Sequence, residues 1–136
     1  MARPVSTALA GTALLVLTAA CGAQSTATSP SPTPTFDIQS AEAEAGIPPK
    51  PDAATQQAYI SALVAIDPDI VHGKEDKAVS RGRDQCSSVK QWPNDQTKLV
   101  DLTQQRFTSP DHPEGFGPDK SAQIIAVVRK YLCPTY

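Results

Sequence analysis

Residues 74–91 read KEDKAVSRGRDQCSSVKQ, and this stretch decides the fold that the sequence predicts. Ala78, Gly82, Cys86 and Val89 recur at helical spacing, which places them on one face of an α-helix. A glycine inside a helix costs about 1 kcal/mol relative to alanine, so we expect Gly82 to allow close approach by a neighbouring helix. The stretch therefore predicts a helix that packs tightly beside Cys86.

Further helical patterns lie on both sides of this stretch. The first covers about residues 52–66, where the Asp52 carboxylate can cap the opening turn. The next covers about residues 95–107, and the last covers about residues 117–132, with Pro118 in its first turn, where the missing N–H costs nothing. The patterns together predict a small all-α, four-helix domain that spans residues 52–136.

The last of these patterns leaves a strand as the alternative, because Ile124, Ile125, Val127 and Val128 are β-branched. The length of the segment and the 3.6-residue spacing of its apolar side chains favour a helix. No alternating segment elsewhere in the chain offers a strand partner. We therefore expect a helix here as well.

The N-terminus has the order of a secretory signal. Arg3 supplies a positive start, and residues 5–20 are apolar, uncharged and short for a membrane span, which needs about 20 residues. The sequence LTAAC at residues 17–21 resembles the lipobox of bacterial lipoproteins, although Thr18 stands where an aliphatic residue is usual. The resemblance implies a signal peptide over residues 1–20 and a diacylglycerol on the thiol of Cys21. The alternative is an ordinary secretory signal that is cut after residue 20.

The cysteine count bears on this choice, because the chain contains 3 Cys: Cys21, Cys86 and Cys133. In an oxidising, extracytoplasmic setting, Cys86 and Cys133 on the apolar faces of two predicted helices are expected to form a disulfide. Its loop of roughly fifty residues would stabilise the fold by about 4 kcal/mol. A redox-active pair is the alternative, but it usually needs Cys-X-X-Cys or a basic setting. The pairing leaves Cys21 free for lipid.

Residues 21–51 are expected to form a disordered tether, since the first half is rich in Ser, Thr and Pro and poor in apolar side chains. Phe36 and Ile38 are isolated apolar residues that either do nothing or dock on the domain. The chain has a formal net charge of −2 and no long run of one sign, so nothing indicates a nucleic-acid partner. The predicted location is the outer face of the cell membrane, with the lipid as the membrane contact.

The sequence GRDQC at residues 82–86 and YLCP at residues 131–134 are similar to a family of small secreted actinobacterial domains, the domain-of-unknown-function family 732. The similarity covers about residues 59–134, and the stretch at residues 110–117 is longer than the family's usual connection. The resemblance implies a short helical domain behind a signal peptide or lipobox, with one disulfide. It implies no activity, because the family has none assigned.

No catalytic, metal or cofactor motif is visible in the sequence, which lacks a phosphate loop, a Gly-X-Ser-X-Gly elbow and a His-Glu-X-X-His helix. His72 lies among carboxylates without the ligand spacing of a calcium loop or a zinc site, which favours a solvated turn. His112 lies in a second expected loop, and the sequence alone cannot bring the two together. We therefore expect no catalytic residue, no metal and no cofactor.

Trp92 is the only Trp, and it precedes Pro93 at a predicted helix end, where it either caps the core or is an exposed anchor. The need of a small core for large side chains favours the core. The leading functional hypothesis is a non-catalytic interaction module that contacts another envelope protein through a patch near Trp92, Phe107 or Phe116. The alternatives are a carrier of a small apolar ligand or lipid in an interhelical cavity, and, less favoured, an enzyme.

Overall fold

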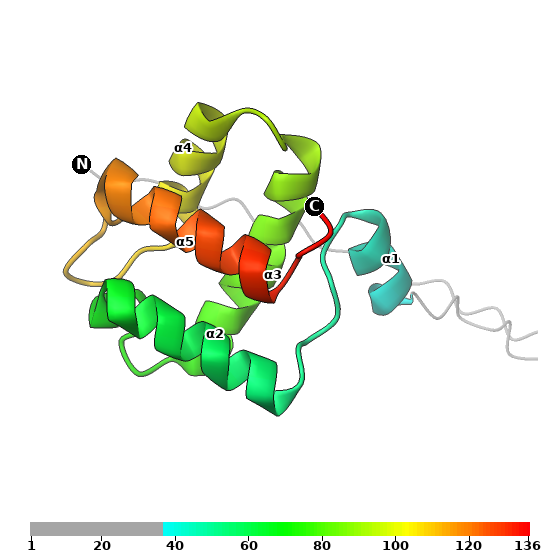
Figure 1. Cartoon of the computed structure of the whole chain (residues 1–136), viewed down its shortest axis with the longest axis horizontal. Helices are drawn as coiled ribbons and strands as arrows, with labels where there is room; N and C mark the ends of the chain where they lie inside the picture. Colours follow the sequence, from blue (N-terminus) through cyan, green and yellow to red (C-terminus); the bar gives the residue numbers. More distant parts are fainter. Residues whose placement is uncertain (1–36) are drawn as a thin grey trace, which may run out of the picture. The chain divides into compact units, whose positions relative to one another are not determined.

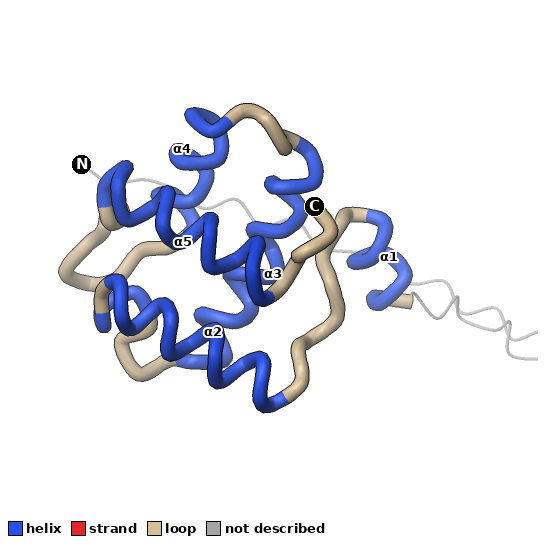
Figure 2. The backbone as a smooth tube through the Cα atoms, in the orientation of Figure 1, coloured by secondary structure: helices blue, strands red, loops and turns tan. Residues whose placement is uncertain are grey.

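The computed structural model describes residues 37–136, and within this range every regular element is helical (Figures 1 and 2). The four predicted helices are present, so the expectation of a small all-α domain is confirmed. The elements in chain order are α1 (Ile38–Glu44), α2 (Ala53–Ile66), the 3-10 helix η1 (Pro68–Ile70), α3 (Glu75–Gln91), α4 (Gln96–Arg106) and α5 (Gly117–Tyr131).

Local side chains begin these helices, as the sequence predicts for Asp52 and Pro118. Asp52 caps α2, because its carboxylate accepts a hydrogen bond from the backbone N–H of Thr55 at 2.9 Å. Asp95 caps α4 in the same way, through the N–H of Lys98 at 2.9 Å. Pro118 lies in the first turn of α5.

Helix α5 is the central element, and it packs against α2, α3 and α4 (Figure 1). Its predicted apolar face is buried, with Ile124, Ile125 and Val128 at 0%, 2% and 0% exposure. The main core lies between α2, α3 and α5, and a smaller cluster of Val89, Leu99 and Ile125 joins α5 to α3 and α4. Burial of these side chains supplies the main driving force for the fold.

Gly82 on α3 lies against Tyr59 of α2 and Leu132, which explains a glycine in mid-helix. A Cβ atom at this position would lie 2.5 Å from Leu132 Cδ1, 2.8 Å from Tyr59 Cζ and closer still to the Tyr59 hydroxyl. The Tyr59 hydroxyl donates to the Ala78 carbonyl oxygen at 3.2 Å, and full burial raises the pKa of this phenol. The predicted close approach beside Cys86 is therefore present.

The disulfide joins Cys86 of α3 to Cys133, just after α5, with Cα atoms 5.9 Å apart. Both residues are buried, at 0% and 3% exposure. The bond fixes the end of α5 on the middle of α3, as the cysteine count predicts. Cys21 lies outside the described residues, as do the predicted signal peptide (1–20) and the predicted tether as far as residue 36.

The expectation of disorder throughout the tether is wrong for residues 37–51, where α1 forms and the chain then contacts α3. Asp37 caps α1 through the N–H of Gln39 at 3.1 Å, and the Ala/Glu-rich sequence that follows favours helix. Arg83 of α3 donates to the Pro48 carbonyl oxygen at 2.7 Å and to the Glu42 carboxylate at 2.6 Å. Composition alone does not predict that this segment is ordered, because its contacts are with Arg83, which is distant in the sequence.

Ile38 does not dock on the domain, since 64% of its surface is exposed. Phe36 lies outside the described residues. Among residues 37–136, none of the helices combines the length and the hydropathy that crossing a membrane requires.

Candidate binding surface

The loop between α3 and α4 carries the exposed aromatic side chain of Trp92, which is 38% accessible to solvent. Trp92 ends α3, where its backbone N–H donates to the Ser88 carbonyl oxygen at 2.8 Å. Pro93 follows and prevents the helix from continuing. The expectation that Trp92 belongs to the core is therefore wrong, and Trp92 is exposed.

Polar contacts hold this loop in place from two sides. Arg129 of α5 donates through Nη2 to the Pro93 carbonyl oxygen at 2.8 Å. Arg106 of α4 donates to the Gln85 side-chain oxygen and, at 3.1 Å, to the Ser88 hydroxyl, both on α3. Burial lowers the pKa of the Arg106 guanidinium, although the charge of Asp84 opposes this shift. Trp92 is thus exposed on a loop whose flanking helices, α3 and α4, are joined by hydrogen bonds.

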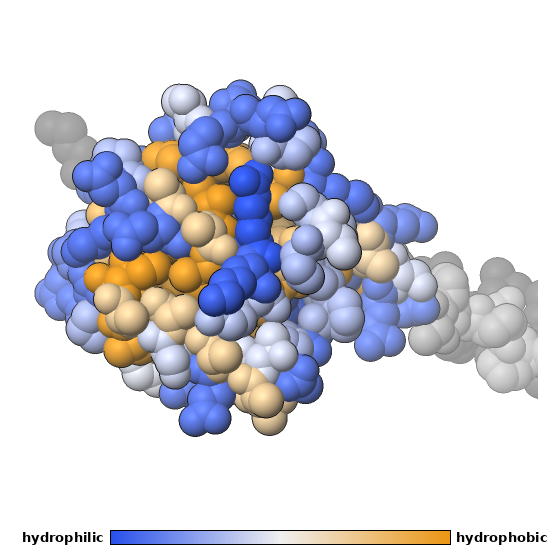
Figure 3. All heavy atoms as spheres, in the orientation of Figure 1, coloured by the Kyte–Doolittle hydropathy of each residue, from blue (hydrophilic) through white to orange (hydrophobic). Residues whose placement is uncertain are grey.

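Two surface hollows meet beside this loop. One, of about 630 Å³, is formed by residues 91–97 around Trp92. The other, of about 590 Å³, lies on α5 and has an apolar floor of Ala122, Ile125 and Ala126. Gln96 lines both hollows, and Arg129 and Lys130 form the charged wall of the second. On the face of the molecule shown in Figure 3, hydrophobic and strongly hydrophilic residues lie next to one another over α5.

Phe107 and Phe116 do not belong to this surface, because they are 1% and 7% exposed and pack in the main core. The prediction that they contact a partner is wrong. Phe107 directly follows α4, and Phe116 directly precedes α5, so both turn inward where the loop closes on the core. A small core needs large side chains to fill it, and here Tyr59 and Phe107 do so in place of Trp92.

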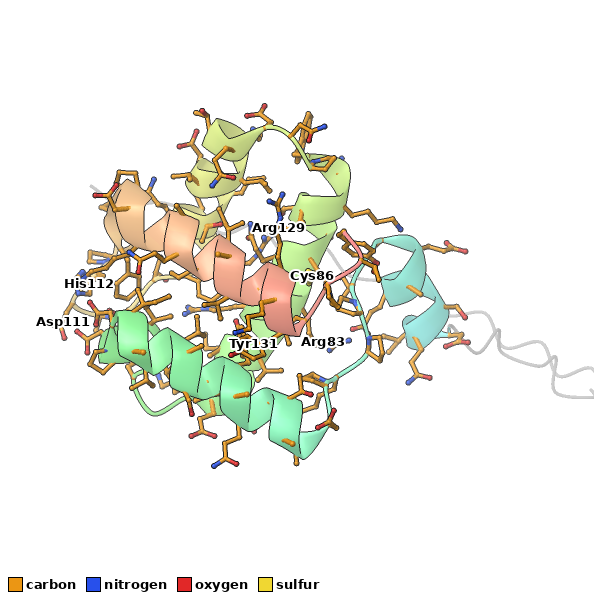
Figure 4. The ribbon with its side chains drawn as sticks, viewed as in Figure 1. Arg83, Cys86, Asp111, His112, Arg129 and Tyr131 are labelled. Atoms are coloured by element: carbon orange, nitrogen blue, oxygen red, sulfur yellow. A yellow bond between two sulfur atoms is a disulfide. The ribbon has the colours of Figure 1, made fainter. Side chains whose placement is uncertain are left out.

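Both histidines lie near Asp69, away from the Trp92 loop. His72 Nδ1 is 3.0 Å from the Asp69 carbonyl oxygen, and His112 Nε2 is 3.6 Å from the Asp69 carboxylate. The Ser109 hydroxyl accepts from the backbone N–H of His112 at 3.1 Å. Figure 4 places His112 near the N-terminal end of α5, whereas Arg129 lies in its C-terminal half. The tertiary structure thus brings the two histidines to one aspartate.

Asp67, two residues before Asp69, forms an ion pair with α5. Lys120 of α5 donates to the Asp67 carboxylate at 2.6 Å, which together with the N–H of Asp69 lowers the pKa of Asp67. Within residues 37–136, no group of three or more His, Cys, Asp or Glu side chains is arranged to hold a metal ion.

The carrier alternative requires an apolar cavity of about 300 Å³ or more between helices. The hollows described above are large enough, but they lie on the surface and are lined partly by charged or amide side chains. A hollow of about 390 Å³ by α4 is lined by Asp101, Glu114 and other polar residues. None of the three hollows is an enclosed apolar cavity.

Sequence reasoning missed Arg129, Lys130 and Gln96. The two cations lie in the last turn of α5, where basic residues are common because they complement the helix dipole. Gln96 opens α4 without any distinguishing neighbour. No local signal could have identified them, because their relation to Trp92 depends on how α5 packs against the α3–α4 loop.

The fold and this surface define the chain as a small, disulfide-bonded all-α domain with an exposed aromatic on a fixed loop. No protein-family model matches the chain, and no match was found among curated proteins or solved structures. The similarity to the actinobacterial family therefore rests on the residues quoted above.

Proposed function

We propose that the chain is a lipid-anchored, extracytoplasmic module that binds another protein of the cell envelope without catalysing a reaction. The observation that carries the proposal is the exposure of Trp92, at 38%, in a surface hollow that shares Gln96 with a second hollow on α5. Tryptophan is among the residues that contribute most to protein interfaces, especially where it is held rigidly beside a pocket. Removal of so large an apolar side chain from water on binding supplies the favourable free energy.

The cysteines support the location. Of the 3 Cys in the chain, Cys86 and Cys133 are bonded to each other, which leaves Cys21 for the lipid. Two acyl chains on one residue anchor a protein stably, whereas a single chain binds only marginally. A disulfide is also what an oxidising compartment permits. The proposed address is the outer face of the cell membrane.

Substitution of Cys21→Ser is expected to move the protein from the membrane fraction to the culture medium, because the thiol that would carry the lipid is lost. Cell fractionation followed by immunoblotting measures the distribution. Ser25→Ala, a few residues further on, is the matched control and should remain with the membrane. Retention of the Cys21→Ser variant in the membrane fraction would refute the lipid anchor.

Substitution of Trp92→Ala is expected to weaken binding of the envelope partner by about thirtyfold, the loss typical of a central aromatic anchor. The measurement is crosslinking in intact cells, followed by affinity capture and quantitative mass spectrometry. Val64→Ala, which alters a 43% exposed apolar residue on α2, is the control and should leave capture unchanged. Equal recovery of the same proteins by the Trp92→Ala variant would contradict the proposal.

A further inference from the structure

The hollow on α5 differs in charge from the other surface hollows described above. Its lining includes the cations Arg129 and Lys130 and no carboxylate. The hollow by α4 has Asp101 and Glu114, and the Trp92 hollow has Asp95. An occupant of the α5 hollow therefore meets a positive wall, and the complementary ligand carries negative charge.

The two cations are not neutralised within the described part of the chain. Among the ion pairs formed by residues 37–136, Lys50, Arg83 and Lys120 each meet a carboxylate, whereas Arg129 and Lys130 do not. Within the same residues, the Arg129 guanidinium forms one hydrogen bond, from Nη2 to the Pro93 carbonyl oxygen. Its Nη1 atom donates to no partner among these residues and is not among the buried unpaired atoms, so this guanidinium has unused hydrogen-bonding capacity toward a ligand.

The rest of the lining indicates which other groups a negatively charged ligand would present to the hollow. Ala122, Ile125 and Ala126 form an apolar floor on α5, against which an aliphatic side chain can pack. Gln96 stands between this floor and the Trp92 hollow, and its amide can both donate and accept a hydrogen bond. A peptide group can both accept and donate a hydrogen bond to this amide, whereas a phosphate diester can only accept one.

We propose that the α5 hollow binds an acidic peptide segment of a partner protein, with a carboxylate at Arg129 and an adjacent aliphatic side chain on the apolar floor. The inference rests on the proposed function, since it names the chemistry of the partner. A planar guanidinium matches a carboxylate better than an ammonium does, because two parallel hydrogen bonds can form. From Gln96 the segment continues toward Trp92, which makes the two hollows one interface.

The only tryptophan of the chain reports directly on this interface. The full chain, purified in detergent, is titrated with the blocked tetrapeptide Ala-Leu-Asp-Ala while Trp92 fluorescence is recorded. We expect a saturable change in fluorescence and at least tenfold weaker binding of the matched peptide with Asn in place of Asp. Equal binding of the two peptides, or no response at millimolar concentration, would overturn the proposal.

Variants of the protein test the assigned residues. Arg129→Gln should weaken the Asp peptide at least tenfold, and Arg129→Lys should restore only part of the loss, because lysine keeps the charge without the planar fork. Lys98→Gln, an exposed position on α4 with the same change in charge, is the control and should bind normally. Circular dichroism confirms folding, and Lys130→Gln, at an exposed position, provides a second test, with an expected loss of several-fold.

The remaining outcomes are also decisive. Arg129-dependent binding to phosphatidylglycerol vesicles, without binding of the Asp peptide, would assign the hollow to a lipid headgroup and overturn the peptide proposal. A Trp92-dependent partner in cells, combined with no peptide binding, would leave the proposed function standing and refute this inference alone. Arg129-dependent binding of the Asp peptide, with the Asn peptide weaker, supports the inference even where capture in cells fails.

Discussion

Reduction of the Cys86–Cys133 disulfide is expected to lower the free energy of unfolding by about 4 kcal/mol, which is close to the whole stability of so small a domain. The bond joins residues 47 apart in the chain, so its loss greatly enlarges the conformational freedom of the unfolded state. Urea denaturation of the oxidised and the reduced protein, followed by circular dichroism, measures the difference.

The reduced protein is the appropriate comparison, because it keeps both sulfur atoms and leaves no cavity. The Cys86→Ser/Cys133→Ser variant should lose more, since it also places hydroxyl groups at positions that are 0% and 3% exposed. A decrease below about 1 kcal/mol on reduction would show that the unfolded chain already holds these segments together, contrary to the expected role of the bond.

Substitution of Gly82→Ala is expected to lower the free energy of unfolding by about 2–3 kcal/mol. Alanine favours helix by about 1 kcal/mol over glycine, but steric overlap in a packed interior costs more than that gain. The added Cβ would lie 2.5 Å from Leu132 Cδ1 and 2.8 Å from Tyr59 Cζ. Neither atom can withdraw easily, since Tyr59 is fully buried and Leu132 is 7% exposed.

The control for Gly82→Ala is Ser80→Ala at an exposed position of the same helix, which should change stability by less than about 0.5 kcal/mol. A double-mutant cycle with Tyr59→Phe identifies the cause, because the Tyr59 hydroxyl is the atom that the methyl group of the introduced alanine would approach most closely. The pair should destabilise the domain by less than the sum of the two single changes. Strict additivity, or a stabilising Gly82→Ala, would refute the proposed overlap.

Much of the fold could be predicted from the sequence, because the deciding interactions are local or covalent. The spacing of Ala78, Gly82, Cys86 and Val89 specifies the buried face of α3 without reference to any other segment. Asp52 and Asp95 begin their helices through contacts three residues away. The predicted tether boundary is wrong because the segment before Asp52 is held by Arg83, 35 or more residues further along the chain.

The binding surface could be predicted only in part. The sequence identifies Trp92 as an anchor candidate but favours its burial, and the other two candidates, Phe107 and Phe116, are core residues. Whether an aromatic side chain is buried depends on which helices cover it, and neighbouring residues do not encode this. Arg129 illustrates the same point, since its contact with Pro93 crosses 36 positions of sequence.

The sequence by itself determined the four main helices of the domain, the Asp52 cap and the cysteine pairing, because periodicity, capping and covalent chemistry act over short distances or between few candidates. Only the tertiary structure decided that Trp92 faces solvent and that Arg129 and Gln96 lie beside it. These relations arise from packing α5 against α3 and α4, and such packing follows from the combined burial of many side chains. The surface proposed to carry the function therefore exists only when these helices have packed together.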